Sequence, residues 1–150
     1  MSIDRPTIYV SSKRIHTQMW RSYRNSGHHI ISTWIDLEGE IAQETIGQDY
    51  WPVWLSEAAS ADYLIFYATP QDSNHACNLL EIAVCLQGGG RVLHVGVSET
   101  MKTASGALAD FVYHPRWYRL ISLDEAFRLA TRPVNEFGAE FTQVSVSSDH

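Results

Sequence analysis

The sequence contains only two cysteines, Cys77 and Cys85, in a chain of 150 residues. They stand eight positions apart in one helical pattern, about two turns, so their side chains cannot meet in a disulfide. This excludes the disulfide-rich scaffolds of secreted proteins and favours a reduced, cytoplasmic protein. The chain also lacks a run of roughly 18 apolar residues and a basic-then-apolar start, so we expect neither a membrane span nor an export signal.

Basic residues are scarce as well. Eleven Lys and Arg stand against seventeen Asp and Glu, which gives a formal net charge of −6. An acidic protein is repelled by polymeric nucleic acid and by anionic membranes, and we expect neither as a partner. A single nucleoside or nucleotide remains a possible small-molecule ligand. With 45% hydrophobic residues, the chain is typical of one globular domain with a sizeable core.

Short apolar segments alternate with helical patterns along the chain. The expected strands are 7–10, 28–35, 63–67, 91–95 and 118–121, and the expected helices are 13–26, 49–60, 76–87 and 122–131, with a loop at 37–48. This alternation predicts right-handed crossovers and a mostly parallel sheet of about five strands with helices on both faces. We therefore predict a flavodoxin-like or Rossmann-like α/β domain over residues 1–132. Residues 133–150 are less hydrophobic and predict a tail or an edge-packing arm.

Polar residues follow several of these strands. In an open parallel sheet, ligands lie beyond the carboxyl ends of the strands, where the loops 11–13, 34–38 and 69–75 emerge. The substrate-binding candidates in these loops are Ser11, Ser12, Asp36, Asp72, Asn74 and His75. The turn 11–14 also follows a strand and opens a helix, so it predicts a site for a 5′-phosphate or, alternatively, a plain helix cap beside a solvated basic turn.

Glu81 is the one anomalous charge in the sequence. It is the only Asp, Glu, Lys or Arg between Asp72 and Arg91, and the helix that carries it is apolar nearly all round, as in a buried helix. A buried carboxylate costs several kcal/mol unless it is hydrogen-bonded, paired or placed at a cleft. Glu81 is therefore either a structural residue, facing solvent or paired with Arg91 or Lys102, or a nucleophile or base at the ligand crevice.

Four motifs carry a resemblance to a known family. They are residues 7–12 (TIYVSS), 61–66 (ADYLIF), 80–83 (LEIA) and 91–93 (RVL). In order and spacing they resemble the nucleoside 2-deoxyribosyltransferase family, whose relatives include the 2′-deoxynucleoside 5′-phosphate N-glycosidases. The likeness covers residues 7–96, and residues 114–115 and 123–126 resemble the closing segment of small members.

The resemblance implies an enzyme, a transferase or hydrolase of nucleotide metabolism. It assigns Glu81 to the family's catalytic glutamate, which attacks the anomeric carbon, and Tyr9 to the tyrosine that positions it. The implied reaction is cleavage or transfer of the N-glycosidic bond of a 2′-deoxynucleoside or its 5′-monophosphate through a covalent glycosyl-glutamate intermediate. It needs no cofactor, and no histidine has the spacing of a metal site, so we expect no metal.

The sequence departs from the family pattern at two places. Residues 75–78 (HACN) stand where the family usually has glycines, and Trp54 stands where a base-binding aspartate is expected. These departures keep two alternatives open. One is hydrolysis of a nicotinamide dinucleotide, as in TIR-type hydrolases, which have a similar glutamate-bearing helix. The other is a sensor that binds a nucleotide without turning it over.

Large aromatic residues are abundant, with five Trp, seven Tyr and five Phe. We expect them to exceed what one core hides, which would leave an aromatic interface on the surface. The family resemblance implies an oligomer as well. We therefore predict a homodimer or larger homo-oligomer with residues 50–54 or 114–118 in the contact.

Overall fold

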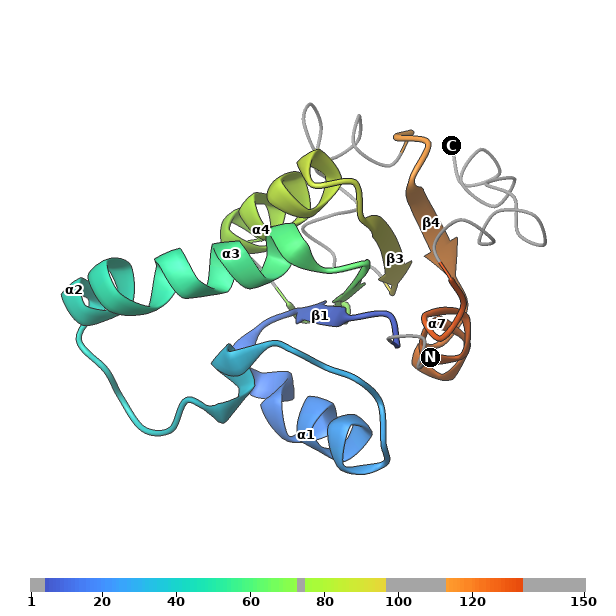
Figure 1. Cartoon of the computed structure of the whole chain (residues 1–150). Coiled ribbons are helices and arrows are strands. Elements are labelled where there is room, and N and C mark those ends of the chain that lie inside the picture. The colour runs from blue at the N-terminus through green and yellow to red at the C-terminus, as the bar shows by residue number, and fades with distance from the viewer. Residues whose placement is uncertain (1–4, 73–74, 97–112, 134–150) are drawn as a thin grey trace.

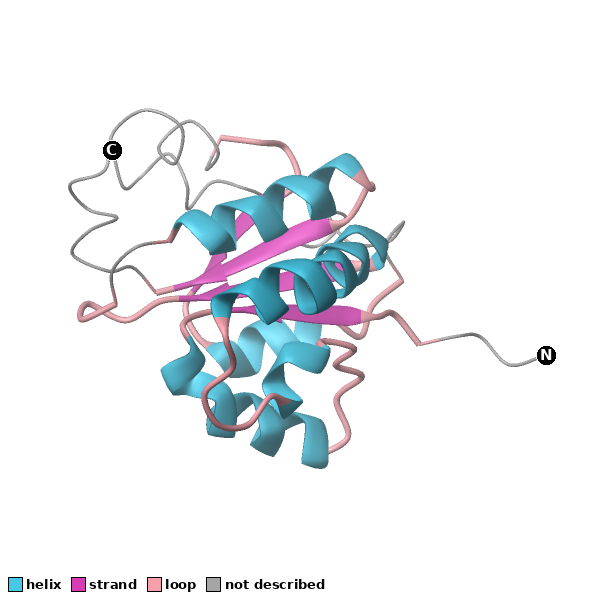
Figure 2. Ribbon diagram, turned by 90° about the vertical axis from the view of Figure 1, so that its left-hand side faces the viewer, coloured by secondary structure: helices cyan, strands magenta, loops and turns pink. Residues whose placement is uncertain are grey.

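The computed structural model describes residues 5–72, 75–96 and 113–133, and four parallel strands form its centre (Figure 2). The strands are β1 (Ile8–Ser11), β2 (Tyr63–Tyr67), β3 (Arg91–Val95) and β4 (Trp117–Leu120), and they lie in this order across the sheet. Val10, Ile65, Leu93 and Tyr118 stand side by side in register. The predicted α/β class with a parallel sheet is confirmed.

Helices connect and cover the strands (Figure 1). Their bounds are η1 (Arg14–His16), α1 (Thr17–Asn25), η2 (Thr33–Asp36), α2 (Gln43–Thr45), η3 (Ile46–Tyr50), α3 (Trp51–Ser60), α4 (Ala76–Gln87) and α7 (Leu123–Leu129). α3 packs along α4, and α4 contacts β1, β2 and β3. α7 contacts β3 and β4. The predicted covering of both faces of the sheet stays a prediction.

The expected start and stop signals account for several of these bounds. Gly27 follows α1 with φ = 108°, a left-handed conformation that glycine adopts without strain and that ends a helix. The Ser122 hydroxyl accepts a hydrogen bond from the Glu125 backbone N–H at 3.2 Å, which caps α7 as the sequence predicts. α4 ends at Gln87, before the glycines 88–90.

The strand predicted at 28–35 is wrong. Only Ile30 forms a bridge, to Ile8 on β1, and Thr33–Asp36 folds into the 3₁₀ helix η2. Side chains explain why the pairing stops. The Ser32 hydroxyl accepts a hydrogen bond from the Val10 N–H at 2.7 Å, and the Trp34 indole donates one to the Val10 carbonyl at 2.8 Å. The backbone groups that a further strand would pair are thus taken, and the described residues contain four strands rather than about five.

The loop predicted at 37–48 is wrong over its second half. The chain is helical from Gln43, passes through the π-helical turn η3 and continues into α3. Gln48 donates a hydrogen bond to Glu44 one turn earlier at 3.3 Å. α3 begins at Trp51 with Pro52 in its first turn, as predicted, but Tyr50 rather than Asp49 is its N-cap residue and no side chain caps it.

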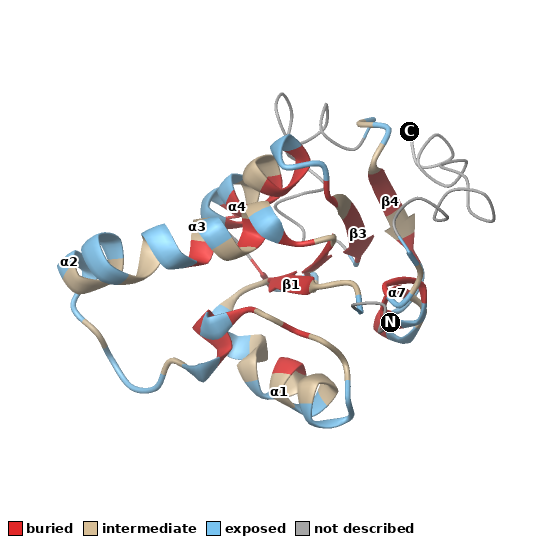
Figure 3. Cartoon of the chain, viewed as in Figure 1, coloured by how far each residue is buried: buried red, intermediate tan, exposed pale blue. Residues whose placement is uncertain are grey.

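Buried residues lie on the strands and on parts of the helices (Figure 3), and aromatic side chains fill much of this core. Trp20 and Trp117 are fully buried, and Trp54 and Tyr118 are buried as well. We expected large aromatic side chains on the surface, but Trp54, Trp117 and Tyr118 are not exposed, and Trp51 is half-buried. The homo-oligomer stays a prediction. Apart from Pro133, the predicted tail lies outside the described residues. None of the described helices is long and apolar enough to cross a bilayer.

The packing of α3 against the end of α4 yields a stability test. A Cβ added at Gly88 would clash with the carbonyl oxygen of Ala59, whereas one added at Gly47 would meet open space. We expect Gly88→Ala to lower the free energy of unfolding by about 1–3 kcal/mol, as overpacking against backbone does. Gly47→Ala, the matched control, should leave stability unchanged or raise it by up to about 1 kcal/mol. Urea denaturation measures both, and equal effects would contradict the close packing at Gly88.

Candidate active site

Glu81 lies in the middle of α4 and is only 6% exposed. Tyr9 and Ser11 stand two positions apart on β1, so their side chains point to the same side of the strand. The Tyr9 hydroxyl donates to one oxygen of the Glu81 carboxylate, and the Ser11 hydroxyl donates to the other at 2.8 Å. Two hydroxyl groups thus hold a buried carboxylate at the end of the first strand.

Asn78 extends this cluster. It lies one turn before Glu81 on α4, and its amide donates to the Ser11 hydroxyl at 2.9 Å. The amide oxygen of Asn78 lies 3.3 Å from Nδ1 of His75, which is buried with its ring edge-on to Phe66. The cluster therefore runs from His75 through Asn78 and Ser11 to Glu81 and Tyr9, and each member restricts the side chain of the next.

Burial sets the protonation behaviour of the cluster. It raises the pKa of Glu81 to about 7, although hydrogen bonds from Tyr9, Ser11 and Asn78 act in the opposite direction. Burial and the neighbouring carboxylate also raise the pKa of Tyr9 well above its usual range. Near neutral pH, Glu81 therefore exchanges between its acid and its carboxylate forms, while Tyr9 stays a neutral donor.

Glu81 and Asn78 form part of the wall of a cavity of about 380 Å³. The other lining residues are Ser12, Lys13, Arg14, Trp34, Leu37, Ile46, Trp51, Trp54 and Cys77. The volume is that of a pocket for a small organic ligand. Three tryptophans and two aliphatic side chains form its apolar part, while the carboxylate, the amide and the two cations form its polar part. Such a cavity suits a ligand with a flat ring at one end and a polar group at the other.

The π-helical turn shapes the apolar part of this cavity. One π turn spans about five residues, so Ile46 and Trp51 fall on the same side of the helix. Trp54 follows within the next α turn, and its ring stacks on Tyr50 at a centroid distance of 5.6 Å. Ile46, Trp51 and Trp54 all line the cavity as a result. Single turns of this kind occur frequently at functional sites.

The structure brings together some of the predicted site residues. Tyr9, Ser11 and Glu81 are in contact, and Ser12 lines the cavity while its hydroxyl accepts a hydrogen bond from the Trp20 indole at 2.7 Å. His75 reaches the cluster through Asn78 without lining the cavity.

The other candidates lie elsewhere. Asp72 accepts hydrogen bonds from His16 at 2.9 Å and from the Thr69 backbone at 2.8 Å, and it does not line the cavity. Asp36 forms an ion pair with Arg24 at 2.7 Å on the surface, also away from the cavity. Asn74 lies outside the described residues.

The alternative that Glu81 is a structural residue, which faces solvent or pairs with Arg91 or Lys102, finds little support. Its carboxylate is buried rather than facing solvent, and its bonds come from hydroxyl groups. Arg91 begins β3 in register with Tyr63, whereas Ser11 stands in register with Phe66 near the opposite end of the sheet. Lys102, the other proposed partner, lies outside the described residues.

Sequence reasoning missed Asn78 and the cavity roles of Trp34 and Cys77. One signal for Asn78 was present, because it stands three residues before Glu81, on the same face of the helix. Trp34 belongs to the loop 34–38 expected at the ligand edge, but its own role was missed, since its position depends on the 3₁₀ turn that replaces the expected strand. Among the described residues, no group of three or more His, Cys, Asp or Glu side chains could hold a metal ion.

Comparisons with known proteins add no further assignment. No protein-family model matches the chain, and no curated protein matches it significantly. The resemblance to the nucleoside 2-deoxyribosyltransferases therefore rests on the sequence motifs alone.

The raised pKa of Glu81 predicts how stability depends on pH. Its pKa is higher in the folded chain, about 7, than the ordinary value of 4.5, so its contribution to stability is present below pH 4.5 and is lost as the pH rises through 7. From 1.36 kcal/mol per pKa unit, the loss is about 3 kcal/mol. We expect Glu81→Gln to remove this loss, so that the variant is more stable than the wild type at pH 8 but not at pH 4. Urea denaturation at both pH values measures the difference, and a pH-independent difference would contradict the assignment.

Proposed function

We propose that the protein cleaves or transfers the N-glycosidic bond of a 2′-deoxynucleoside or its 5′-monophosphate, with Glu81 as the nucleophile. One observation carries this proposal: a buried carboxylate, held on both oxygens by hydroxyl groups, forms part of the wall of a cavity large enough for a nucleoside. The order and spacing of the four sequence motifs support the same assignment.

The chemistry needs a carboxylate at this place. As the C–N bond breaks, the bonding electron pair leaves with the nucleobase, which takes up a proton from solvent water, and positive charge develops on the sugar ring. The Glu81 carboxylate stabilises that charge and forms an ester bond to the anomeric carbon. Water, or a second nucleobase, then attacks the same carbon and releases Glu81. Hydrolysis follows in the first case and base exchange in the second.

The surrounding groups suit the two ends of such a substrate. Trp34, Trp51 and Trp54 line the cavity and offer apolar surface to a base, and base–aromatic stacking contributes about 1–3 kcal/mol per base. Lys13 and Arg14 bring positive charge to the same cavity, where a 5′-phosphate would be neutralised. Tyr9 and Ser11 hold the carboxylate rather than the substrate, so they are positioning residues.

The finer expectations from the sequence belong to this proposal as well. They are the transferase or hydrolase activity, a reaction without a cofactor, a homo-oligomeric assembly and a cytoplasmic location.

A direct experiment tests the activity. The protein is incubated with deoxynucleosides, their monophosphates and free bases, and mass spectrometry identifies which compounds disappear and which new ones form.

Replacing the nucleophile gives the sharpest mutational test. Glu81→Gln keeps the shape and the hydrogen-bonding capacity of the side chain but deletes the nucleophilic oxygen. We expect it to lower kcat by about a thousandfold or more, as the loss of a nucleophile does, while nucleotide binding persists. Glu44→Gln, the same change on an exposed residue outside the cavity, should keep full activity. Wild-type turnover by Glu81→Gln would refute the mechanism.

The role of Tyr9 predicts a shift in the pH profile. Activity should rise with pH through about 7, because the carboxylate form of Glu81 is the nucleophile. The Tyr9 hydroxyl lowers the pKa of Glu81, so Tyr9→Phe should move this rise to higher pH and reduce kcat/KM at pH 7. Tyr23→Phe is the matched control, since the Tyr23 hydroxyl binds Asp124 on the surface. A fall in activity without a shift of the profile would leave Tyr9 with a purely structural role.

A further inference from the structure

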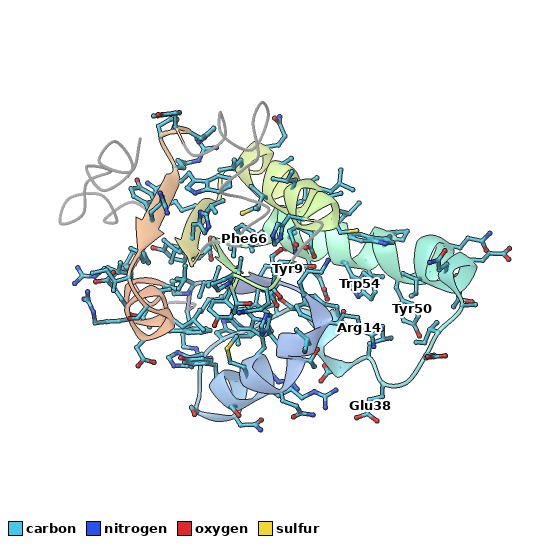
Figure 4. All side chains as sticks on the ribbon, turned by 180° about the vertical axis from the view of Figure 1, so that it is seen from behind. Tyr9, Arg14, Glu38, Tyr50, Trp54 and Phe66 are labelled. Atoms are coloured by element: carbon cyan, nitrogen blue, oxygen red, sulfur yellow. The ribbon has the colours of Figure 1, made fainter. Side chains whose placement is uncertain are left out.

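A second, shallower hollow of about 470 Å³ adjoins the cavity. It is lined by Arg14, Ile15, Thr17, Gln18, Arg21, Leu37, Glu38 and Gly39. Arg14 and Leu37 line both hollows, so the two share a wall. Figure 4 shows Arg14 between Trp54, which belongs to the cavity, and Glu38, which belongs to the second hollow. We call the two hollows together the extended groove.

One side of the continuous helical segment formed by η1 and α1 supplies most of the hydrogen-bond donors of the second hollow. Residues 14, 17, 18 and 21 follow the spacing i, i+3, i+4, i+7, which places them on the same side of a helix. At 1.5 Å per residue, the seven steps from Arg14 to Arg21 extend about 10 Å. A single phosphate beside Arg14 would leave most of this length unused, including the guanidinium of Arg21 and the amide of Gln18.

The two arginines are held differently. The Arg14 guanidinium donates to the Gly39 carbonyl at 3.4 Å, which is a long hydrogen bond. Arg21 is fixed through Nε, which donates to the Ile35 carbonyl at 2.6 Å, and its Nη1 lies 3.6 Å from the Glu38 carboxylate. Glu38 is 80% exposed, so this ion pair is weak and can be displaced by a stronger anion.

Electrostatics favour an anionic occupant. Lys13, Arg14 and Arg21 line the extended groove, although the chain as a whole has a formal charge of −6. The opposing carboxylates are Glu38, which faces solvent, and Glu81, which is partly protonated near neutral pH. Two guanidinium groups about two turns apart suit an anion with more than one phosphate, because each can bind a separate phosphate in a bidentate way.

We propose that the extended groove binds an N-glycoside whose sugar carries a diphosphate, with the base and sugar in the cavity and the two phosphates between Arg14 and Arg21. The placement of the sugar at Glu81 rests on the proposed function, whereas the diphosphate site rests on the groove itself. A free nucleoside diphosphate and a dinucleotide joined through its diphosphate share this chemistry. The substrate class is thereby extended beyond nucleosides and monophosphates.

Binding to the wild-type protein tests the diphosphate site without reference to the reaction. Inorganic pyrophosphate should bind about tenfold more tightly than inorganic phosphate in calorimetric titrations, as one added charge-assisted contact of about 1.5 kcal/mol implies. Arg21→Gln should remove this preference. Glu38→Gln should strengthen it, because the competing carboxylate is gone. Arg24→Gln, an arginine on the same helix that pairs with Asp36 outside the groove, is the matched control. Equal binding of the two anions, or an unchanged preference in Arg21→Gln, would overturn the proposal.

Nucleotides then test the extended ligand. The nucleosides, monophosphates and diphosphates of the four deoxynucleosides, together with NAD, are titrated into Glu81→Gln, which should bind them without turnover. We expect each diphosphate to bind about tenfold more tightly than its monophosphate. NAD binding equal to that of the best diphosphate indicates a dinucleotide as the natural ligand, and weaker NAD binding indicates a free diphosphate. Diphosphates that bind no better than monophosphates overturn the extended ligand.

The two proposals fail in different ways. If the wild-type protein cleaves none of these compounds but prefers pyrophosphate through Arg21, the N-glycosidase function fails and the diphosphate site stands. If it cleaves nucleosides as efficiently as their diphosphates and binds both anions equally, the function stands and the diphosphate site is overturned.

Discussion

The site depends on one interaction: the Tyr9 and Ser11 hydroxyls on β1 bind the buried carboxylate of Glu81 on α4. Taking a carboxylate out of water costs several kcal/mol, and the hydroxyls of Tyr9 and Ser11 offset part of that cost. The bonds join residues about 70 positions apart in the chain, so they fix the helix against the end of the first strand. Neither element alone would hold the carboxylate. β1 lies beside β2 in the sheet, and the chain leads from β2 into α4. This order of the elements brings Glu81 to the end of β1, where it forms part of the cavity wall.

Much of this arrangement could be predicted from the sequence. β2, α4 and β3 have the expected bounds, because each is an apolar segment that ends at a polar loop or a glycine. Glu81 was identifiable as a lone charge in an apolar helix. Ser11 followed from parallel-sheet geometry, which gathers the carboxyl ends of the strands at one edge. Tyr9 followed from the family resemblance, and its contact with Glu81 is consistent with that likeness.

The features that the sequence did not predict depend on contacts between side chains and backbone groups of distant segments, which no local sequence pattern indicates. Residues 28–35 have strand-forming composition, but Ser32 and Trp34 use side-chain atoms to satisfy the backbone of Val10, and the pairing ends there. The hydrogen bond from the Trp34 indole to the Val10 carbonyl also fixes the position of this side chain, which lines the cavity. Asp36 was expected at the site because it follows that segment. Arg24, twelve residues earlier in the chain and on a different element, pairs with it instead.

Trp54, which lines the cavity, bears on where the specificity of the proposed reaction lies. An indole offers one N–H donor and no acceptor, so it cannot accept a hydrogen bond from the edge of a base. Stacking on a tryptophan is tolerant, because every nucleobase presents a similar aromatic face. Lys13 and Arg14, by contrast, bring positive charge to the cavity. Under the proposed function, discrimination between ligands should therefore depend mainly on the sugar and its anionic substituent, that is, on the side of the cavity that adjoins the second hollow.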